Sequence, residues 1–292
     1  MDVVCFGELI ADFLPAGTSG NGYPLFEFNP GGAPANVAAA IARLGADSAF
    51  IGKVGDDLLG KLLVESIKGI NVDISGIVTD ASEKTAMSLV HLDETGERSF
   101  CFFGENPADL ALREHELNIE LITNCKVFHF GARSLLSPNS KTALERGISC
   151  AKQSGASISF DPNLRPELWP NVDKAREDGL WGIDHADLIK LSMEEVNIIF
   201  GNERIEDLLE LMHSKGKQCV ITDGKNGAFF WNGNEVQHVP AFPVSAVDTT
   251  GAGDAFWGAF LFFFITEQHK NYYKSYYETV RKACAAGALA TL

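Results

Sequence analysis

The stretch KVFHFGARSLLSPNSKTALERGISCAKQSGASISF, residues 126–160, places one helical segment between two short apolar runs. The same alternation continues as far as residue 222. Strands of four to eight residues that alternate with longer helices form crossover units, which build a mostly parallel sheet covered by helices on both faces. The sequence therefore predicts an α/β fold, with strands at 127–131, 157–160, 187–191 and 219–222 and helices at 140–153, 172–182 and 205–213.

The segments on either side continue this pattern. In each, apolar runs of strand length alternate with helix-like spacing. The expected elements are strands at 3–10 and 49–54, helices at 34–44 and 58–67, a β-hairpin that pairs 228–231 with 235–239, and two helices that begin near Ala252 and Tyr272.

Two segments lack the long helices found elsewhere. Residues 12–30 are rich in Gly, Pro, Asn and Phe and show no helical periodicity. Residues 85–92 and 98–103 are β-prone runs joined by DETGE, residues 93–97, which predicts a hairpin. We expect them to form a small β subdomain (residues 13–30 and 85–104) inserted in a larger body (residues 1–12, 31–84 and 105–292).

Composition excludes several classes of protein. The chain has 292 residues, 46% hydrophobic and 22% charged, which is typical of a packed globular protein rather than a disordered one. It carries 24 Lys+Arg against 39 Asp+Glu, a net charge of −15. Proteins that bind nucleic acid or anionic membranes depend on clustered Lys and Arg, so neither partner is expected. Small anions that backbone N–H groups can hold remain possible ligands.

Features of secreted and membrane proteins are missing from the sequence. Met1–Cys5 contains an acid where a signal peptide has Lys or Arg. The longest strongly apolar stretch, Phe256–Ile265, is about half of the ~20 residues that span a bilayer, which favours a buried helix. The six cysteines are scattered singly, with no CxxC pair. We expect free thiols and a cytoplasmic enzyme.

The stretch VDTTGAGDAFWGAF, residues 247–260, is the strongest candidate for a chemical site. Small residues at 251–253 leave backbone N–H groups uncovered where a helix begins, and the helix dipole adds positive charge there. Such a site can bind phosphate. Asp254 lies in this positive end, where an ionised carboxylate can accept the proton of a hydroxyl that attacks a γ-phosphate. The alternative is an ordinary Asp cap with glycines for close packing.

Two other phosphate motifs do not fit. Residues 55–62, GDDLLGKL, resemble a Walker A loop but are one residue short, and Leu62 replaces the Ser or Thr that holds magnesium. We interpret them as a loop and a helix start. A dinucleotide fingerprint requires GxGxxG, and residues 251–256 lack the third glycine.

A second glycine cluster, GGAPANVA, occupies residues 31–38 before an Ala-rich helix. Paired glycines let a ligand approach the backbone closely. Asn36 offers both a donor and an acceptor to a polyol. An ordinary turn and helix start remains the alternative.

Together these motifs resemble the two signatures of the ribokinase-like, or PfkB, family of carbohydrate kinases. The first is GGAPANVAAAIARLG (31–45) and the second DTTGAGDAFWGAF (248–260), with GKVGDD (52–57) and DPNLRPELW (161–169) between them in order. The resemblance covers essentially the whole chain and is greatest to the fructokinases of the family. It implies a three-layer sandwich, in which a mostly parallel sheet lies between helices and a small β lid covers the sugar.

The resemblance also implies roles for individual residues. Asp254 would be the catalytic base, and the amides of Gly251, Ala252 and Gly253 would form the anion hole for the transferred phosphoryl group. Arg165 would stabilise charge near the sugar and the phosphates. The sugar would be bound by Asp12, Gly31, Gly32, Asn36, Phe102 and Asn163, together with Arg165 and Asp254. For Asp12 alone, a solvated turn residue is the alternative.

The same resemblance implies ATP, Mg²⁺ and K⁺ as cofactors. ATP would contact Ser192, Thr222, Gly224 and Gly227, besides Gly251 and Gly253. Glu195 matches the acid of the family's NxxE motif, which acts on magnesium through water, although Ser192 stands in place of the Asn. Asp248 and Thr250 would help to bind the monovalent cation.

The expected reaction is transfer of the γ-phosphoryl group of MgATP to the 6-hydroxyl of D-fructose. Phe102-Phe103 is followed by Gly104-Glu105 where related kinases have an aromatic-Arg pair. An acid there would repel a carboxylate, which favours a neutral sugar. Alternatives are a family kinase for 2-keto-3-deoxygluconate, ribose or a nucleoside, and a non-catalytic sugar-binding homologue.

Two further expectations concern the lid and the C-terminus. Phe26, Phe100 and Phe102 would form an apolar clasp between the lids of a homodimer. The chain ends at residue 292, in the middle of a motif by comparison with family members that continue through a loop near the adenine and cation sites, so part of those sites is expected to be missing.

Overall fold

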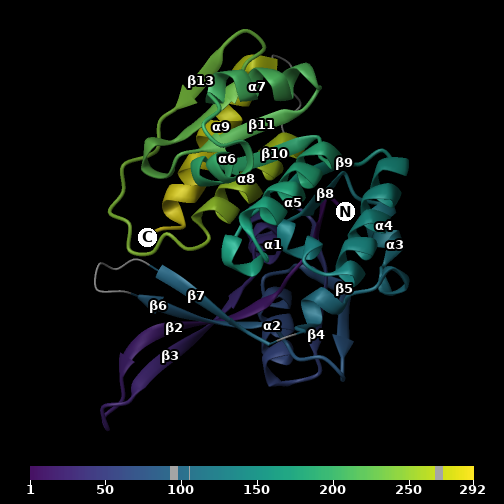
Figure 1. The fold of residues 1–292 in the computed structure, drawn as a ribbon, viewed down its shortest axis with the longest axis vertical. Helices are drawn as coiled ribbons and strands as arrows, with labels where there is room; N and C mark the ends of the chain where they lie inside the picture. Colours follow the sequence, from purple (N-terminus) through teal and green to yellow (C-terminus); the bar gives the residue numbers. More distant parts are fainter. Residues whose placement is uncertain (93–97, 105, 267–271) are drawn as a thin grey trace.

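The computed structural model describes residues 1–92, 98–104, 106–266 and 272–292, with two β-sheets (Figure 1). Within these ranges the larger sheet has nine strands in the order β13-β12-β11-β10-β9-β8-β1-β4-β5. β12 runs antiparallel to both of its neighbours, and the other pairs are parallel. The strands are β1 (Val3–Phe6), β4 (Ser48–Gly55), β5 (Asp73–Asp80), β8 (Val127–Phe130), β9 (Ser157–Phe160), β10 (Leu188–Ser192), β11 (Gln218–Thr222), β12 (Ala228–Trp231) and β13 (Val236–Val239).

Helices cover both faces of this sheet, which confirms the predicted three-layer α/β fold. Successive residues of β1 alternate between two separate cores: Val3 and Cys5 belong to one, and Val4 and Phe6 to the other. Helices α1 (Ala33–Arg43), α2 (Leu58–Lys68), α8 (Ala252–Thr266) and α9 (Tyr272–Leu289) pack in the first core. The second contains α3 (Ile119–Thr123), α4 (Pro138–Gln153), α5 (Val172–His185), α6 (Met193–Phe200) and α7 (Ile205–Ser214).

The predicted β subdomain is a separate sheet that projects from one end of the body (Figure 1). In the described part its strand order is β3-β2-β6-β7. The expected hairpin is confirmed, because Met87–Leu92 pairs antiparallel with Arg98–Phe103, while its turn at 93–97 lies outside the described residues. The strands are β2 (Ile10–Thr18), β3 (Pro24–Gly31), β6 (Met87–Leu92) and β7 (Arg98–Phe103), so β2 begins inside the expected body segment.

Among the α-helices and strands of the described residues, α3, α6 and β5 were not predicted, and α3 has only five residues. Helix α6 follows β10 without a loop and has only eight residues, too few for a periodic pattern to stand out. Strand β5 forms the edge of the large sheet, and its alternation is obscured by Asp73, Ser75, Thr79 and Asp80.

The GDDLLGKL segment is a loop and a helix start, as interpreted above. Gly55 ends β4, and the side chain of Asp57 caps α2 by accepting a hydrogen bond of 2.9 Å from the backbone N–H of Gly60. The other carboxylate oxygen accepts from the backbone N–H of Thr85 at 2.9 Å, just before β6. Asp57 therefore connects α2 to the base of the second sheet.

The expectations for the thiols and the apolar stretch are also confirmed. All six cysteines are free thiols, five of them buried. Phe256, Trp257 and Phe260 of α8 are buried in the core. In the ranges given above, no helix is both long enough and apolar enough to cross a membrane.

Candidate active site

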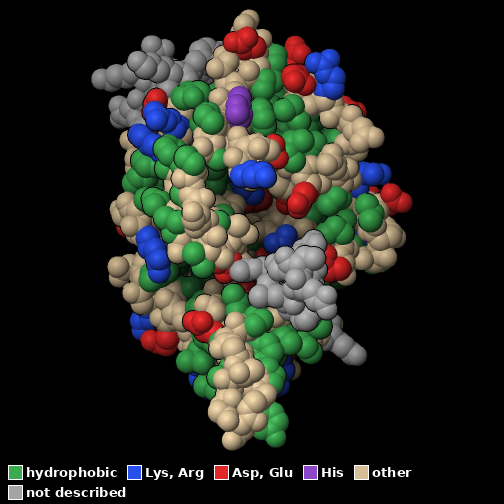
Figure 2. Space-filling view, turned by 90° about the vertical axis from the view of Figure 1, so that its left-hand side faces the viewer, with side chains coloured by type: hydrophobic (Ala, Val, Ile, Leu, Met, Phe, Trp, Pro, Cys, Tyr) green, Lys and Arg blue, Asp and Glu red, His purple; other side chains and the backbone are tan. Residues whose placement is uncertain are grey.

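A large cavity of about 1130 Å³ lies where the carboxyl ends of the parallel strands meet the start of α8 and the second sheet. Figure 2 shows the hollow between the two parts of the molecule, with acidic and basic side chains side by side around it. Residues from both ends of the chain line it. Those expected from the sequence are Asp12, Gly32, Asn36, Phe102, Asn163, Arg165, Ser192, Glu195, Thr222, Gly224, Thr250, Gly251, Gly253 and Asp254.

Four expected site residues do not line this cavity: Gly31, Gly227, Asp248 and Ala252. A Cβ at Gly31 would overlap the carboxylate of Asp12, so this glycine makes room for a lining residue. A Cβ at Gly227 would overlap the backbone carbonyl of Val239, which indicates a packing role beside the last hairpin. Asp248 accepts a hydrogen bond of 2.7 Å from the backbone N–H of Thr250 and so holds the loop before α8.

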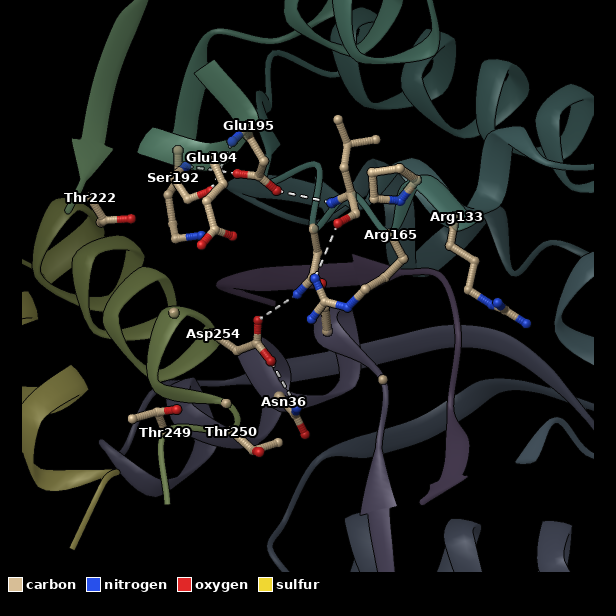
Figure 3. Close-up of a pocket in the computed structure, with 18 of the residues that line it drawn as sticks. Asn36, Arg133, Arg165, Ser192, Glu194, Glu195, Thr222, Thr249, Thr250 and Asp254 are labelled. Carbon is tan, nitrogen blue, oxygen red and sulfur yellow. Dashed lines mark hydrogen bonds between the residues drawn. The ribbon is translucent and has the colours of Figure 1, made fainter. Parts of the chain in front are cut away.

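Asp254 lies in the first turn of α8, 5% exposed. The side-chain amides of Asn36 and Asn163 each donate a hydrogen bond to its carboxylate, at 2.8 Å and 3.3 Å (Figure 3). Burial raises the pKa of Asp254 above its ordinary value, while the bond from Asn36 and the charges of Lys190 and Arg165 oppose this rise. The carboxylate is thus held in place by two amides and is poised to accept a proton.

The backbone around Asp254 supports the same arrangement. Asn163 adopts a left-handed φ of 44°, which is unusual for a residue with a side chain and brings its amide to the carboxylate. Gly251 has a φ of 73°, which favours glycine where the loop turns into α8. The backbone N–H of Ala252 donates to the carbonyl of Thr249 at 3.2 Å, and the next N–H groups of the first turn of α8 can bind an anion.

A buried ion pair that the sequence analysis missed lies beside this helix end. Lys190 of β10 donates to Asp161 at 2.7 Å, with both side chains almost fully buried. Its ammonium is 3.4 Å from the position that a Cβ on Gly253 would occupy. Burial lowers the pKa of Lys190, but nearby carboxylates, led by Asp161, raise it overall. Burial also raises the pKa of Asp161, and the proton stays on the ammonium, whose ordinary pKa is far higher.

Glu195 holds the loop that carries Asn163 and Arg165. One carboxylate oxygen accepts from the backbone N–H of Leu164 at 2.9 Å, and the other from the backbone N–H of Ser192 at 2.7 Å. The Ser192 hydroxyl accepts in turn from the backbone N–H of Glu195, which completes a capping box for α6. Both oxygens of Glu195 are therefore engaged in structure, and a magnesium role through water stays a prediction. The neighbouring Glu194 also lines the cavity.

Figure 3 shows that the cavity has two ends. Ser192, Glu194, Glu195 and Thr222 lie together on one side of Asp254, next to the carboxyl ends of β10 and β11. The hydroxyls of Ser192 and Thr222, with Gly224 in a left-handed turn at φ 47°, fit a polar ligand, whereas the carboxylates of Glu194 and Glu195 would repel phosphates that come without a cation. In the parts of the chain described, no group of three or more His, Cys, Asp or Glu residues forms a ready-made metal site.

The other end is formed jointly by the body and the second sheet. The Ser88 hydroxyl donates to Asp12 at 2.5 Å, and burial raises the pKa of Asp12. Phe102 of β7 is half-buried, lines the cavity and lies against the guanidinium of Arg133, while its expected part in a subunit clasp stays a prediction. Arg133 and Glu8 also line this end and were not predicted. Glu105 and the side chain of Phe100 lie outside the described parts.

Known proteins resemble the chain over its whole length. The family described as "pfkB family carbohydrate kinase" matches residues 1–292. Fructokinase-1 of Zea mays is 41% identical, covering 99% of this chain and 91% of the maize protein. A Vibrio cholerae fructokinase structure with fructose, ADP and calcium bound has a TM-score of 0.89 at 33% identity, covering 99% of this chain and 92% of that one. A Salmonella enterica aminoimidazole riboside kinase structure has a TM-score of 0.83 at 28% identity, covering 100% and 93%.

Proposed function

Because the chain belongs to the PfkB family of carbohydrate kinases, we propose that it transfers the γ-phosphoryl group of MgATP to the 6-hydroxyl of D-fructose. The family and the relatives support a phosphotransferase with a sugar hydroxyl as acceptor. Fructose and its 6-hydroxyl are the specific part of the proposal. The observation that carries the proposal is the position of Asp254, which is buried at the amide end of α8 and held by Asn36 and Asn163.

In the proposed reaction Asp254 accepts the proton of the attacking hydroxyl. A buried carboxylate with a raised pKa is a better proton acceptor than an exposed one, because its basicity is closer to the working pH. The amides of Gly251 and Gly253 receive the charge of the transferred phosphoryl group, aided by the dipole of α8. The expected third amide, that of Ala252, donates to the backbone carbonyl of Thr249 at 3.2 Å instead. Arg165 and Lys190, which both line the cavity, add positive charge near Asp254.

ATP would occupy the end formed by Ser192, Thr222 and Gly224. A bound magnesium ion would neutralise the phosphate oxygens during transfer. In this proposal Glu195 acts on that ion through water, and Asp248 and Thr250 help to hold K⁺ next to the anion site. The support for ATP and a divalent ion is that related fructokinase structures contain ATP in one case and ADP with calcium in another.

The proposed sugar is supported by the relatives and by the charges at the second end of the cavity. The curated relatives at 40–44% identity are named as fructokinases. Asp12 adds negative charge near the proposed sugar site, which disfavours a sugar acid. The riboside kinase structure favours a nucleoside as the second candidate substrate, since its fold matches over the whole of this chain.

The second sheet is proposed to act as a lid that closes over the sugar and excludes water. Exposed apolar side chains on it, Tyr23, Leu25, Phe26 and Phe103, would join two lids in a homodimer. Phe103, which is 47% exposed, adds a residue to the expected clasp of Phe26, Phe100 and Phe102.

The decisive experiment replaces Asp254 with Asn and measures ATP consumption with fructose, ribose, tagatose, 2-keto-3-deoxygluconate and adenosine. We expect the unaltered protein to favour fructose and Asp254→Asn to lower kcat by about 10²- to 10⁴-fold, because the proton acceptor is lost. Asp207→Asn, an exposed acid on α7, is the matched control and should leave kcat unchanged. Near-normal turnover by folded Asp254→Asn would remove the assignment, and no sugar-dependent ATP use by the unaltered protein would favour a non-catalytic binder.

A further inference from the structure

One buried cation of the cavity has no part in the proposed transfer. Arg133 lies in a short helical turn, η3 (Ala132–Leu135), directly after β8, and is 9% exposed. It lines the cavity with Asp12, Asn36 and Phe102. In the view of Figure 3, Arg165 lies between Arg133 and Asp254. Arg133 therefore belongs to the end of the cavity that is remote from the proposed base.

The charge of Arg133 is already balanced by its surroundings. Its Nε donates to Asp109 at 2.7 Å, and the two side chains are 10% and 1% exposed. Glu8 is the next carboxylate, buried, with one oxygen accepting from the backbone N–H of Ala33 at 3.0 Å. In the described chain its other oxygen, and the second oxygen of Asp109, are buried without a hydrogen-bond partner. Because Asp109 neutralises Arg133, this pair offers no excess positive charge to an anionic ligand.

The rest of the guanidinium is held in place but not satisfied. Of the three guanidinium nitrogens of Arg133, only Nε donates a hydrogen bond to a described residue. The N–H groups of the two terminal nitrogens are therefore available to an acceptor on a ligand. The ring of Phe102 lies 5.3 Å from the guanidinium carbon, a cation–π distance. Asp109 from the body and Phe102 from the second sheet thus fix the guanidinium at the cavity wall. Guanidinium donors in a buried site favour a ligand that brings oxygen acceptors.

We propose that Arg133 is a specificity-determining residue, whose terminal N–H groups donate hydrogen bonds to neutral oxygens of the sugar at the end remote from the phosphorylated hydroxyl. The inference rests on the proposed function, and in D-fructose these oxygens are the hydroxyls on C1 and C2. A sugar with a carboxylate at that end would place a further negative charge beside Glu8 and Asp109. The site therefore selects neutral ketoses, because the positive charge of Arg133 is already neutralised by Asp109 and does not attract an anionic sugar.

The test compares Arg133→Met on three sugars: fructose, 1-deoxyfructose, which lacks the C1 hydroxyl, and 2,5-anhydromannitol, which lacks the C2 hydroxyl. We expect kcat/KM for fructose to fall about 10- to 100-fold, mainly through KM, since a hydrogen bond from a charged donor is lost. The KM for ATP should not change. The fall should be at least threefold smaller for an analogue that already lacks the contacted hydroxyl. Equal falls on all three sugars would overturn the proposal.

A second variant separates sugar contact from folding. Arg133→Met alone leaves Asp109 buried and unpaired, which destabilises the protein. Arg133→Met/Asp109→Asn removes both charges, and we expect it to recover the thermal unfolding midpoint but not kcat/KM for fructose. Recovery of both would show that Arg133 only neutralises Asp109, and would refute its contact with the sugar. Arg176→Met, at a half-exposed site on α5, is the matched control and should behave as the unaltered protein.

Titration calorimetry with fructose, run beside the assay, distinguishes the two proposals. If the unaltered protein binds fructose without using ATP, the proposed function fails, and a lower fructose affinity of Arg133→Met still supports the sugar contact. If the unaltered protein phosphorylates fructose and Arg133→Met does so equally well, only the role of Arg133 fails. If fructose does not bind at all, both are refuted.

Discussion

The proton affinity of Asp254 depends on a small number of side chains. Its burial raises the pKa, and the amide of Asn36, which donates at 2.8 Å, stabilises the charged form and lowers the pKa. Removing that amide should therefore raise the pKa of Asp254 further. The base must be ionised to accept a proton. As the pH is lowered, the variant would therefore lose activity at a higher pH than the unaltered protein does.

We predict that Asn36→Ala shifts the acid side of the pH profile of kcat to higher pH. Saturating sugar isolates this effect from any loss of sugar binding, because kcat reports the groups of the bound complex. Asn197→Ala, at an exposed position of α6, serves as the control. An unshifted profile in Asn36→Ala would mean that Asp254 is not the group that limits activity in acid.

Glu8 gives the second prediction at this scale. Burial raises its pKa from 4.5 to about 7, while Arg133 and the N–H of Ala33 act in the opposite direction. A raised pKa in the folded state means that stability linked to Glu8 is fully present below pH 4.5 and is lost as the pH rises through 7. The loss is on the order of 3 kcal/mol of unfolding free energy. Urea unfolding of Glu8→Gln should show a flatter pH dependence in this window, and profiles parallel to those of the unaltered protein would contradict it.

At the scale of elements, α2 is connected to the second sheet through Asp57. Its carboxylate caps the helix at Gly60 and accepts from the backbone N–H and hydroxyl of Thr85. In the described chain the side chain of the adjacent Asp56 makes only an exposed ion pair with Lys61. Asp57→Ala should lower the unfolding free energy by about 2–3 kcal/mol, because a cap and two further hydrogen bonds are lost. Asp56→Ala should change it by less than about 1 kcal/mol.

Denaturant titration checks this pair, and ATP affinity is the second measurement. Neither variant should weaken ATP binding, since the GDDLLGKL segment is a helix start and not a phosphate loop. A large loss of ATP affinity in Asp57→Ala with unchanged stability would reverse that interpretation.

The sequence predicted those elements whose side chains repeat with a clear period. Helix α7 shows its apolar face directly, with Leu208, Leu209 and Met212 buried. Helix α6 was missed because its start is set by a reciprocal cap between Ser192 and Glu195, which a hydrophobic pattern does not reveal. The glycine clusters and Asp254 could be found since local backbone chemistry defines them.

Site residues that depend on contacts between distant segments could not be predicted in the same way. Lys190 and Asp161 are 29 positions apart, and Arg133 and Asp109 are 24 apart. The one local signal was a charged residue inside an otherwise apolar run, as for Lys190 in the strand LIKLS. A buried charge requires a partner, so such a residue indicates an ion pair without naming the partner.

At the scale of the whole molecule, the second sheet exposes apolar side chains that the body does not cover. Tyr23, Leu25 and Phe26 are 70%, 46% and 43% exposed. We predict that the protein sediments as a dimer at micromolar concentration and that Phe26→Asp shifts it toward the monomer, since a charge in an apolar interface lacks a partner. Leu211→Asp, an exposed leucine on α7, is the control. A monomeric unaltered protein would refute the lid-to-lid contact.

The hydrogen bond between Asn36 and Asp254 joins positions 218 residues apart, one near each end of the chain. During synthesis on the ribosome, the segments that carry Asp12, Asn36 and Phe102 emerge long before the carboxylate that they serve. A nascent chain that already has the second sheet therefore has no base with which to act on a sugar. Activity should appear only after the segment that carries Asp254 has left the ribosome, so truncation products that end before residue 254 would be catalytically silent.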